Sequence, residues 1–269
     1  MVPSRETARR LIVEHQVLVD GAFAAKPARM VDGGQAISLV GPAPEFVSRA
    51  GHKLAGALDE FGLDPAGWVC LDAGSSTGGF TDCLLQRGAA QVVAVDVGTN
   101  QLHERLRRDS RVDVRERTDI RSVDPSEFTP GFDLVVGDLS FISLKLVVPV
   151  LARLLRENGS CLLLIKPQFE AGRQEASKGR GVISDPAIWR RTVADVLLVA
   201  AEADLRAEGL APASLRGTRG NVEFVALLVT AGSTISGVGS PENAMPEQSM
   251  IDALVDDAVD QAVALAVEP

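Results

Sequence analysis

The sequence lacks the features that mark several classes of protein. None of its apolar runs is long enough to span a bilayer, and the N-terminal segment MVPSRETARR has no apolar signal core. Its three cysteines, Cys70, Cys83 and Cys161, lie in apolar contexts without the spacing of metal ligands. We therefore expect a soluble cytoplasmic protein with reduced core cysteines, no bound metal and no membrane partner.

Two common phosphate-binding motifs are also missing. The glycine-rich segment DAGSSTGGF (72–80) has neither the G-x-G-x-x-G spacing of dinucleotide-binding proteins nor the G-K-[ST] of a P-loop. Both motifs hold phosphate groups against backbone N–H groups at the start of a helix. A ligand of the adenosine type without phosphates therefore fits this segment better.

The region around this segment has the order of a βαβ unit. An apolar run at 68–71 precedes the glycines, an amphipathic stretch at 81–88 follows them, and a second apolar run at 91–96 ends in Asp96. Nucleotide-binding α/β folds share this order. The glycines let backbone come close to a ligand, and the Asp96 carboxylate can accept hydrogen bonds from both ribose hydroxyls.

Strands and helices continue to alternate along the chain. We expect strands at 112–116, 132–138, 160–165, 210–215 and 221–229, helices at 101–109, 143–157 and 186–206, and a long loop at 168–185. Residues 45–230 are therefore predicted to form an α/β domain with a doubly wound, mostly parallel sheet. The last two strands resemble a hairpin, which predicts one antiparallel edge.

The charges are distributed unevenly. The chain has 36 acidic and 27 basic residues, but residues 231–269 contain seven of the acids and no Lys or Arg. The remainder is nearly neutral, so a local basic surface can still bind nucleic acid. In this acidic tail we expect disorder over 231–247 and an amphipathic helix over 249–267 that packs on the protein itself.

Residues 1–44 predict a small α+β unit. A helix beginning near Ser4, the strand-and-turn segment VLVDG, a Lys-Pro step and a short strand at 36–40 follow one another. This pattern resembles the S4-type RNA-binding domain, whose members carry a further helix before it, so we expect an incomplete domain. The resemblance implies RNA phosphate contacts by Arg5, Arg9, Arg10 and Lys26; the alternative is that these are ordinary solvated charges.

Charged residues gather where the predicted strands end. They are Asp72, Asp96, Asp138 and Lys166 at strand ends, Lys53 on the helix before the first strand, and Glu223 in the segment GNVEF. Charged residues seldom lie beside apolar strands unless they are paired. In a doubly wound sheet, ligands bind at the carboxyl ends of the strands, so these side chains are candidates for an active site.

The segments VSRAGHKL, LDAGSSTGGF, VVAVDVG, FDLVVGDLSFIS, LLLIKPQFE and GNVEF together are similar to one family. They resemble the TlyA (haemolysin A) family of S4-domain, FtsJ-type ribosomal RNA 2′-O-methyltransferases. The resemblance implies a Rossmann-like domain that uses S-adenosylmethionine. It assigns a catalytic Lys-Asp-Lys-Glu tetrad to Lys53, Asp138, Lys166 and Glu223. It assigns cofactor binding to Asp72, Gly74, Ser75, Ser76, Thr77, Gly78, Gly79, Phe80, Asp96, Asp119 and Asp138.

The tetrad suits the reaction, because a ribose hydroxyl is a very weak acid. A lysine amine, with an ordinary pKa of about 10.4, acts as a base only where its surroundings favour the neutral form. We predict Lys166 as general base, steered by Asp138, with Lys53 stabilising the oxyanion and Glu223 holding Lys53 or the hydroxyl in place. The two lysines could exchange roles. Alternatively, the four residues form two internal ion pairs without a catalytic role.

Further residues are candidates for contacts with RNA. Phe141 follows Asp138 in the run DLSF and either stacks on an extruded base or belongs to the core. The absence of prolines from this run disfavours amino-directed methyltransferases, which have an N/D-P-P-Y element there. Arg117, Arg173 and Arg180 are candidates for phosphate contacts, and Asp119 for accepting from the adenine amine.

Three functions remain open at this point. The resemblance implies 2′-O-methylation of cytidines in ribosomal RNA of the large subunit and, in longer members, of the small subunit, a modification associated with sensitivity to capreomycin-type antibiotics. The second possibility is a ribosome assembly factor that binds RNA without catalysis. The third, suggested by the family's older name, is a haemolysin. The intact tetrad argues against the second, and the missing signal peptide against the third.

Overall fold

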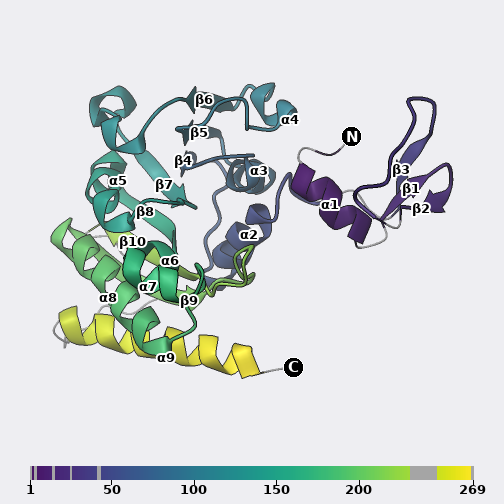
Figure 1. Ribbon diagram of the computed structural model, residues 1–269. Helices are drawn as coiled ribbons and strands as arrows, with labels where there is room; N and C mark the ends of the chain where they lie inside the picture. The colour runs from purple at the N-terminus through teal and green to yellow at the C-terminus, as the bar shows by residue number, and fades with distance from the viewer. Residues whose placement is uncertain are drawn as a thin grey trace.

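The computed structural model describes residues 2, 5–13, 16–24, 26–40, 44–230 and 247–267. A seven-stranded sheet forms the centre of the molecule (Figure 1). Its strands, in spatial order, are β6 (Val112–Glu116), β5 (Gln91–Asp96), β4 (Val69–Ala73), β7 (Phe132–Gly137), β8 (Leu155–Ile165), β10 (Phe224–Thr230) and β9 (Leu205–Pro212). All neighbours from β6 to β8 pair in parallel, whereas β10 is antiparallel to both β8 and β9.

This order confirms the predicted α/β fold and the antiparallel pair at one edge, where β9 is the edge strand. The last strand in the sequence, β10, lies inside the sheet between β8 and β9 and is antiparallel to both. The reason is burial: six of the seven residues of FVALLVT are buried, so this strand needs a neighbour on both sides. β9 carries Arg206, Glu208 and a terminal Pro212, which suit an edge strand.

Helices cover both faces of the sheet, because side chains alternate along each strand. On β4 and β8, Leu71 and Leu163 point to one face, where α5 (Val148–Leu154), α8 (Pro186–Glu202) and α9 (Glu247–Val267) pack. Cys70 and Leu162 point to the other face, against α2 (Ala50–Glu60), α3 (Gly79–Gln86) and α4 (Glu104–Arg107). All three cysteines are buried and unpaired, and burial raises the pKa of the Cys70 and Cys83 thiols to about 12.

Several predicted boundaries were wrong. The helix expected over 143–157 is a 3-10 turn, η3 (Leu144–Leu146), followed by α5, and residues 155–157 already belong to β8. Leu155 pairs with Phe132, and the positive φ of Asn158 marks the irregularity that follows. The loop expected over 168–185 contains two short helices, α6 (Pro167–Glu170) and α7 (Arg173–Lys178).

Other elements are displaced for local reasons. The helix expected over 101–109 is reduced to α4, which begins where the His103 side chain accepts from the Arg105 N–H. α8 ends at Glu202, four residues before the expected end, because Asp204 adopts a left-handed conformation with φ +60° and reverses the chain into β9. β10 begins at Phe224, so Glu223 lies just before the strand.

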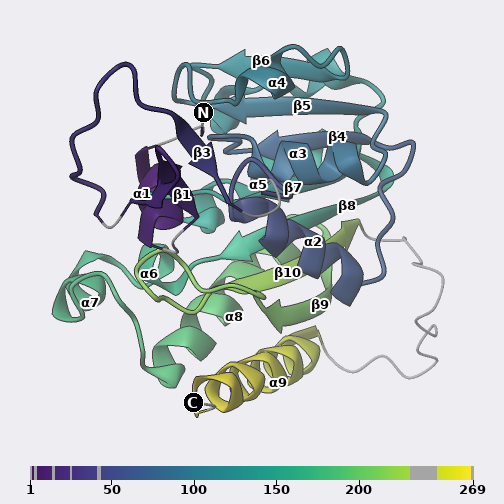
Figure 2. The same ribbon diagram turned by 90° about the vertical axis from the view of Figure 1, so that its right-hand side faces the viewer.

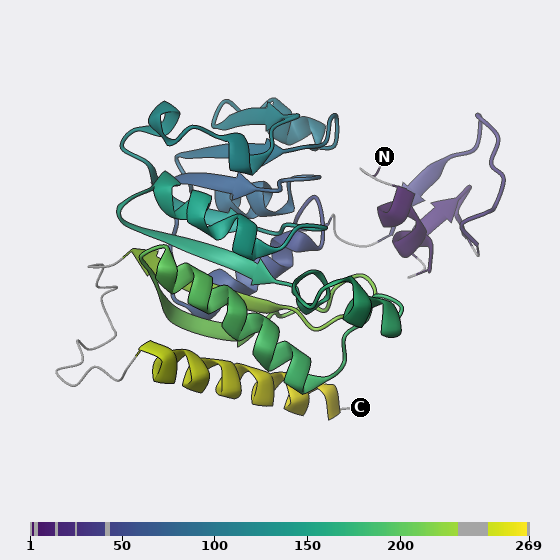
Figure 3. The same cartoon turned by 60° about the vertical axis from the view of Figure 1, so that its left-hand side comes forward.

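The acidic helix α9 packs against α8 and β9 (Figures 1 and 3). Ile251, Val255 and Val259 are buried in this contact. Arg190 of α8 bridges two acids of α9, donating to Asp256 at 2.8 Å and to Asp260 at 2.5 Å. The segment expected to be disordered lies almost entirely outside the described residues. None of the helices within the described ranges is long and apolar enough to cross a membrane.

The N-terminal residues form a separate small unit. It consists of α1 (Arg5–Val13) and a three-stranded antiparallel sheet in the order β2 (Ala22–Phe23), β1 (Val17–Val19) and β3 (Ile37–Leu39), of which β2 was not expected. Leu11, Val17 and Val19 form its core. In Figures 1 and 2 this unit lies beside the central sheet, with α1 between its small sheet and the larger domain.

Candidate active site

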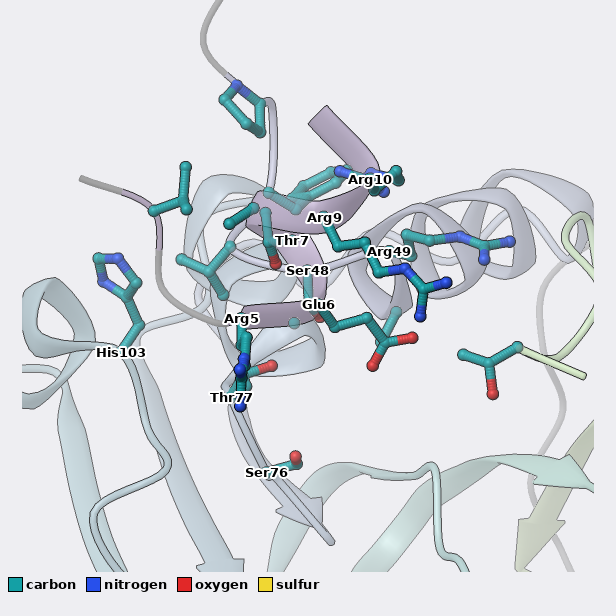
Figure 4. Close-up of a pocket in the computed structure, with 18 of the residues that line it drawn as sticks. Arg5, Glu6, Thr7, Arg9, Arg10, Ser48, Arg49, Ser76, Thr77 and His103 are labelled. Carbon is teal, nitrogen blue, oxygen red and sulfur yellow. The ribbon is translucent and has the colours of Figure 1, made fainter. Parts of the chain in front are cut away.

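A cleft of about 1500 Å³ lies at the carboxyl ends of the parallel strands. Its walls come from α1, from the residues that lead into α2, and from the glycine-rich loop between β4 and α3. Figure 4 shows Arg5, Arg9, Ser48, Thr77 and His103 around this space. Lys53, Asp138 and Lys166 also line it, so three of the four predicted tetrad residues share one cavity.

The first lysine of the tetrad is paired with the glutamate. Lys53 Nζ lies 2.5 Å from Glu223 Oε2, and both residues are buried. Lys53 is on the first turns of α2, whose apolar residues Leu54 and Leu58 fix that helix against the sheet. Glu223 lies just before β10, so the pair fastens α2 to the residue that precedes this strand. A charge-assisted hydrogen bond of this length holds both groups firmly.

The second lysine is paired with the aspartate. Lys166 Nζ lies 2.6 Å from Asp138 Oδ1 and donates to the hydroxyl of Ser140 at 2.9 Å. Lys166 follows β8 and Asp138 follows β7, so two adjacent parallel strands deliver the two charges to one place. The register of β8 with β10 pairs Ile165 with Phe224, which puts Lys166 next to Glu223. The two ion pairs are therefore neighbours.

The glycine-rich loop adopts backbone conformations that favour glycine. Gly74 has φ +84° and Gly78 has φ +94°, and Ser76 between them has φ +47°. A side chain at Gly78 would also collide with Leu102 and Leu106, which pack on the loop from the side of α4. The loop is thus held as a thin wall of the cleft, where backbone N–H groups can meet a ligand.

Asp72 is the buried acid at the end of β4. Its Oδ2 accepts from the Thr81 N–H at 2.9 Å and from the Thr81 hydroxyl at 2.6 Å. Its Oδ1 has no hydrogen-bond partner within the described residues, although Asp72 lines the cleft. Burial raises the pKa of Asp72 to about 7, and the hydrogen bonds from Thr81 oppose this increase.

The other two predicted cofactor acids have different surroundings. Asp96, at the end of β5, accepts from the backbone N–H of Ser76 at 2.8 Å and of Gly98 at 2.6 Å, which fixes its carboxylate beside the glycine-rich loop. Asp119 is bound by the guanidinium of Arg121, which lowers the pKa of Asp119. Neither Asp96 nor Asp119 is among the residues that line the cleft.

The predicted RNA contacts divide into two groups. Arg5, Arg9 and Arg10 of α1 line the cleft (Figure 4). Lys26, Arg117 and Arg180 are exposed but lie outside the lining of the cleft, and the side chain of Arg173 lies outside the described part of the chain. Among the predicted RNA contacts whose side chains the structure describes, the arginines of α1 therefore share the cleft with three of the predicted catalytic residues, and Lys26, Arg117 and Arg180 do not.

Phe141 is an exposed aromatic residue. Its side chain is 92% exposed, which makes the alternative of a core phenylalanine wrong. Its φ is +66°, a conformation that bulky residues seldom adopt without a functional reason. The ring lies 5.2 Å from that of Phe169, and Lys166 Nζ lies 5.8 Å from the Phe169 ring. An exposed ring beside the second ion pair can stack on a base.

Sequence reasoning missed four residues around the site. Ser140 contacts Lys166, and Phe169 contacts Phe141. Gln168 donates to Glu223 Oε1 at 3.3 Å. Asp82 accepts from the Val47 N–H at 2.8 Å and forms an ion pair with Arg105, which ties the segment before α2 to α3 and α4. The sequence feature that could have identified Ser140, Gln168 and Phe169 is their position two or three residues after Asp138 or Lys166.

Fold and site together define the class. The sheet order, the glycine-rich loop after β4 and the acid at the end of β5 are the arrangement of an α/β domain for a nucleoside-type ligand. The paired lysines at neighbouring strand ends supply acid–base groups. Among the residues that the structure describes, no group of three or more His, Cys, Asp or Glu side chains is arranged to hold a metal ion.

Comparison with known proteins gives the family. The family model described as FtsJ-like methyltransferase matches residues 46–229, and the chain belongs to this family. The 16S/23S rRNA (cytidine-2′-O)-methyltransferase TlyA of Mycobacterium tuberculosis is 45% identical over 228 residues, which cover 84% of this chain and 85% of that protein. Hemolysin A of Brachyspira hyodysenteriae is 36% identical over 83% of this chain and 92% of its own length.

A solved structure is also similar over nearly the whole chain. The structure of a hemolysin-type protein from Streptococcus thermophilus has a TM-score of 0.75 at 36% identity, and the match covers 99% of this chain and 94% of the other. A second such structure, from Lactococcus lactis, has a TM-score of 0.69 at 41% identity over 80% of this chain.

Membership of this family implies S-adenosylmethionine as methyl donor, and the residues present fit it. The unpartnered Oδ1 of Asp72 is a buried acceptor that suits an ammonium group such as that of the methionine part. The loop from Gly74 to Gly78 leaves backbone exposed to the cleft, and Asp96 lies next to it with a fixed carboxylate.

The buried pair of Lys53 and Glu223 leads to a stability prediction. Glu223→Gln leaves the Lys53 ammonium buried without its carboxylate, so we expect the free energy of unfolding to fall by about 3 kcal/mol. The double variant Lys53→Met/Glu223→Gln removes the unmatched charge and is expected to recover most of that loss. Urea denaturation followed by circular dichroism measures both.

An exposed ion pair provides the control for this comparison. Arg87 and Asp59 form a pair at 2.7 Å on the surface. Asp59→Asn is expected to change the free energy of unfolding by less than about 1 kcal/mol. If the losses from Lys53→Met and Glu223→Gln simply add in the double variant, the two side chains are not energetically coupled.

Proposed function

We propose that this protein transfers the methyl group of S-adenosylmethionine to the ribose 2′-oxygen of a cytidine in ribosomal RNA. The observation that supports this best is the pair of adjacent lysine–carboxylate contacts in a cleft whose wall is the glycine-rich loop. Ribosomal RNA as substrate rests on the named activity of the relative from M. tuberculosis. If ribosomal RNA is the substrate, the protein acts in the cytoplasm and binds ribosomal subunits.

In this proposal the glycine-rich loop would hold the cofactor. The backbone from Gly74 to Phe80 would contact the methionine part, and Asp72 Oδ1 would accept from its ammonium group. Asp96 would accept from the ribose hydroxyls with the lone pairs that its two backbone donors leave open. Asp119 can reach the adenine amine only if it gives up part of its contact with Arg121. When bound, S-adenosylmethionine supplies an electrophilic methyl group.

The Lys166–Asp138 pair is proposed to remove the proton from the 2′-hydroxyl. The neutral amine of Lys166 would accept the proton of the 2′-hydroxyl while the hydroxyl oxygen bonds to the methyl carbon. The bond from that carbon to the sulfonium sulfur would break at the same time, and its electron pair would stay on the sulfur as a neutral thioether. Asp138 then stabilises the new ammonium at a separation of 2.6 Å, and Ser140 holds Nζ in place from the other side. This is the role of a carboxylate that orients a base and stabilises its charged form.

The Lys53–Glu223 pair is proposed to stabilise the negative charge that develops on the 2′-oxygen. Lys53, held by Glu223, presents a cation to the oxygen as it loses its proton, in a buried site where water competes little. The opposite assignment, with Lys53 as base, has the same groups in reversed roles. Asp138 and Glu223 each match one lysine, so both assignments keep the charges balanced.

We also propose how the RNA lies. The arginines of α1 contact backbone phosphates above the cleft, as expected of an S4-type unit formed by residues 1–44, and residues 45–230 form the methyltransferase domain. Phe141 stacks on the extruded base of the target nucleotide, because its ring is exposed beside the catalytic pair. Arg117, Arg173 and Arg180 remain candidates for more distant phosphate contacts.

Substitution of Lys166 tests the chemistry. We expect Lys166→Ala to reduce methyl transfer from labelled S-adenosylmethionine to unmodified ribosomal subunits by about 10²- to 10⁴-fold, the usual contribution of a general base. Lys166→Arg keeps the charge but cannot be deprotonated, so it is expected to be equally inactive if Lys166 is the base. Lys145→Ala, which affects a surface pair with Asp195, is the control.

The same assay separates the alternatives. Full activity of Lys166→Arg would assign the base to Lys53. An unsubstituted protein that binds subunits and S-adenosylmethionine but transfers no methyl group to any ribose would favour the ribosome assembly factor.

The buried Asp72 leads to a pH prediction. The pKa of Asp72 is raised to about 7, and its protonation removes the carboxylate that would face the ammonium group. We expect the affinity for S-adenosylmethionine to fall roughly tenfold between pH 7 and pH 5.5, a range in which an α-amino group stays charged. Isothermal titration calorimetry measures the dissociation constant at each pH.

Two variants show whether Asp72 causes this dependence. Asp72→Asn is expected to bind the cofactor weakly at every pH, with no slope over this range. Asp64→Asn, an exposed acid away from the cleft, is expected to behave like the unsubstituted protein. A slope that persists in Asp72→Asn would assign the titration to another group.

Phe141 leads to a prediction about the substrate. Stacking of a base on an aromatic side chain contributes about 1–3 kcal/mol, so we expect Phe141→Ala to lower kcat/KM for structured RNA roughly 10- to 100-fold. The affinity for S-adenosylmethionine is expected to be unchanged, and Phe141→Trp to retain most of the activity. Leu146→Ala removes another exposed apolar side chain and serves as control. Equal losses in Phe141→Ala and Phe141→Trp would argue against stacking.

A further inference from the structure

Gln168 occupies an unusual position behind the tetrad. It is the second residue of α6, two positions after Lys166, and its amide donates from Nε2 to Glu223 Oε1 at 3.3 Å. Its own Oε1 is buried and has no hydrogen-bond partner within the described residues. A buried carbonyl without a partner costs stability, so a purely structural role would be met better by an apolar side chain of the same size.

The orientation of this amide is fixed by chemistry. An ionised carboxylate can only accept hydrogen bonds, so the NH₂ group of Gln168 must face Glu223 and its carbonyl must point away. The opposite orientation would place two acceptors against each other. The unpartnered carbonyl is therefore a consequence of the donation to Glu223.

Glu223 is then held from two sides. Its Oε1 accepts from Gln168, and its Oε2 lies 2.5 Å from Lys53 Nζ. A side chain at Gly217 would collide with Oε1, so the loop after β9 also comes close to this carboxylate. The Lys166–Asp138 pair lies at the adjacent strand end. A carboxylate held on both oxygens cannot rotate away from the lysine that lines the cleft.

We propose that Gln168 is a positioning residue of the methyl-transfer site, acting through Glu223 to hold Lys53 in place. It touches neither substrate nor cofactor in this proposal. The inference rests on the proposed function for its effect on activity, but the contact that it describes exists without substrate. It therefore has a consequence that can be measured on the protein alone.

The first measurement is the reactivity of Lys53. The unsubstituted protein, Gln168→Met and Gln168→Glu are treated with limiting acetic anhydride at pH 8, and acetylation of Lys53 is quantified by peptide mass spectrometry. Gln168→Met keeps the volume but removes the donor, so Glu223 holds Lys53 less firmly and acetylation is expected to rise severalfold. Gln168→Glu adds a second carboxylate near Lys53, which favours the ammonium form, and acetylation is expected to fall.

Opposite directions in the two variants distinguish positioning from packing. A merely structural role for Gln168 would loosen the site in both variants and change Lys53 reactivity in the same direction, and that result would overturn the proposal. Gln174→Met on α7 removes an exposed glutamine and is expected to leave Lys53 acetylation unchanged. Thermal unfolding of each variant shows whether the fold is retained.

The second measurement uses the reaction. We expect Gln168→Met to lower kcat about tenfold, with KM for the RNA and the dissociation constant of S-adenosylmethionine unchanged. A change confined to KM would contradict the proposed role. If the unsubstituted protein methylates no RNA, the proposed function fails, and the acetylation experiment still decides whether Gln168 positions Lys53 through Glu223.

Discussion

The site depends on one electrostatic constraint: two lysine side chains are buried at the end of a sheet, and each needs a carboxylate. An isolated ammonium would cost far more to bury than any single contact in this protein returns. Lys53 and Lys166 therefore fix the places of Glu223 and Asp138, and through them the relative positions of α2, β7, β8 and β10. The parallel arrangement makes this possible, because it delivers the ends of neighbouring strands to one edge. The pairing that stabilises the fold also arranges the groups that the proposed chemistry needs.

The short helix α6 connects these pairs to the RNA side of the cleft. Three of its consecutive residues have different partners: Gln168 contacts Glu223, Phe169 contacts Phe141, and Glu170 accepts from Ser143 and from the Leu144 N–H. These three residues thus connect the loop after β7 and the residue before β10 to the end of β8.

The sequence indicated the fold class, the cleft at the strand ends and the four charged residues, because strand order and strand-end position follow from local patterns. It also paired Lys166 with Asp138, and Glu223 with Lys53 or the substrate hydroxyl, and the structure contains the contacts Lys166–Asp138 and Lys53–Glu223. It did not indicate that β10 lies between β8 and β9, which places Glu223 beside Lys166. Nor did it predict α6, because a helix of four residues has no periodic pattern to detect. The surroundings of Asp119 could not be predicted either. Its contact with Arg121, two residues later, forms in a local turn, and the pattern of apolar residues in strands gives no information about such a turn. Phe141 required the structure to distinguish surface from core.

The charge distribution bears on the proposed binding of RNA by an acidic chain. The net charge of −9 includes the seven acids of the C-terminal segment, and α9 carries most of them on the edge of the sheet formed by β9. The N-terminal unit, with the arginines of α1, lies beside a different part of the domain (Figure 1). At physiological salt, exposed charges separated by more than about 8 Å are largely screened. The acids of α9 are fastened to α8 by Arg190 and by buried apolar contacts. The cleft itself is lined by the arginines of α1 together with Lys53, Lys166, Asp138, Asp72 and Glu6.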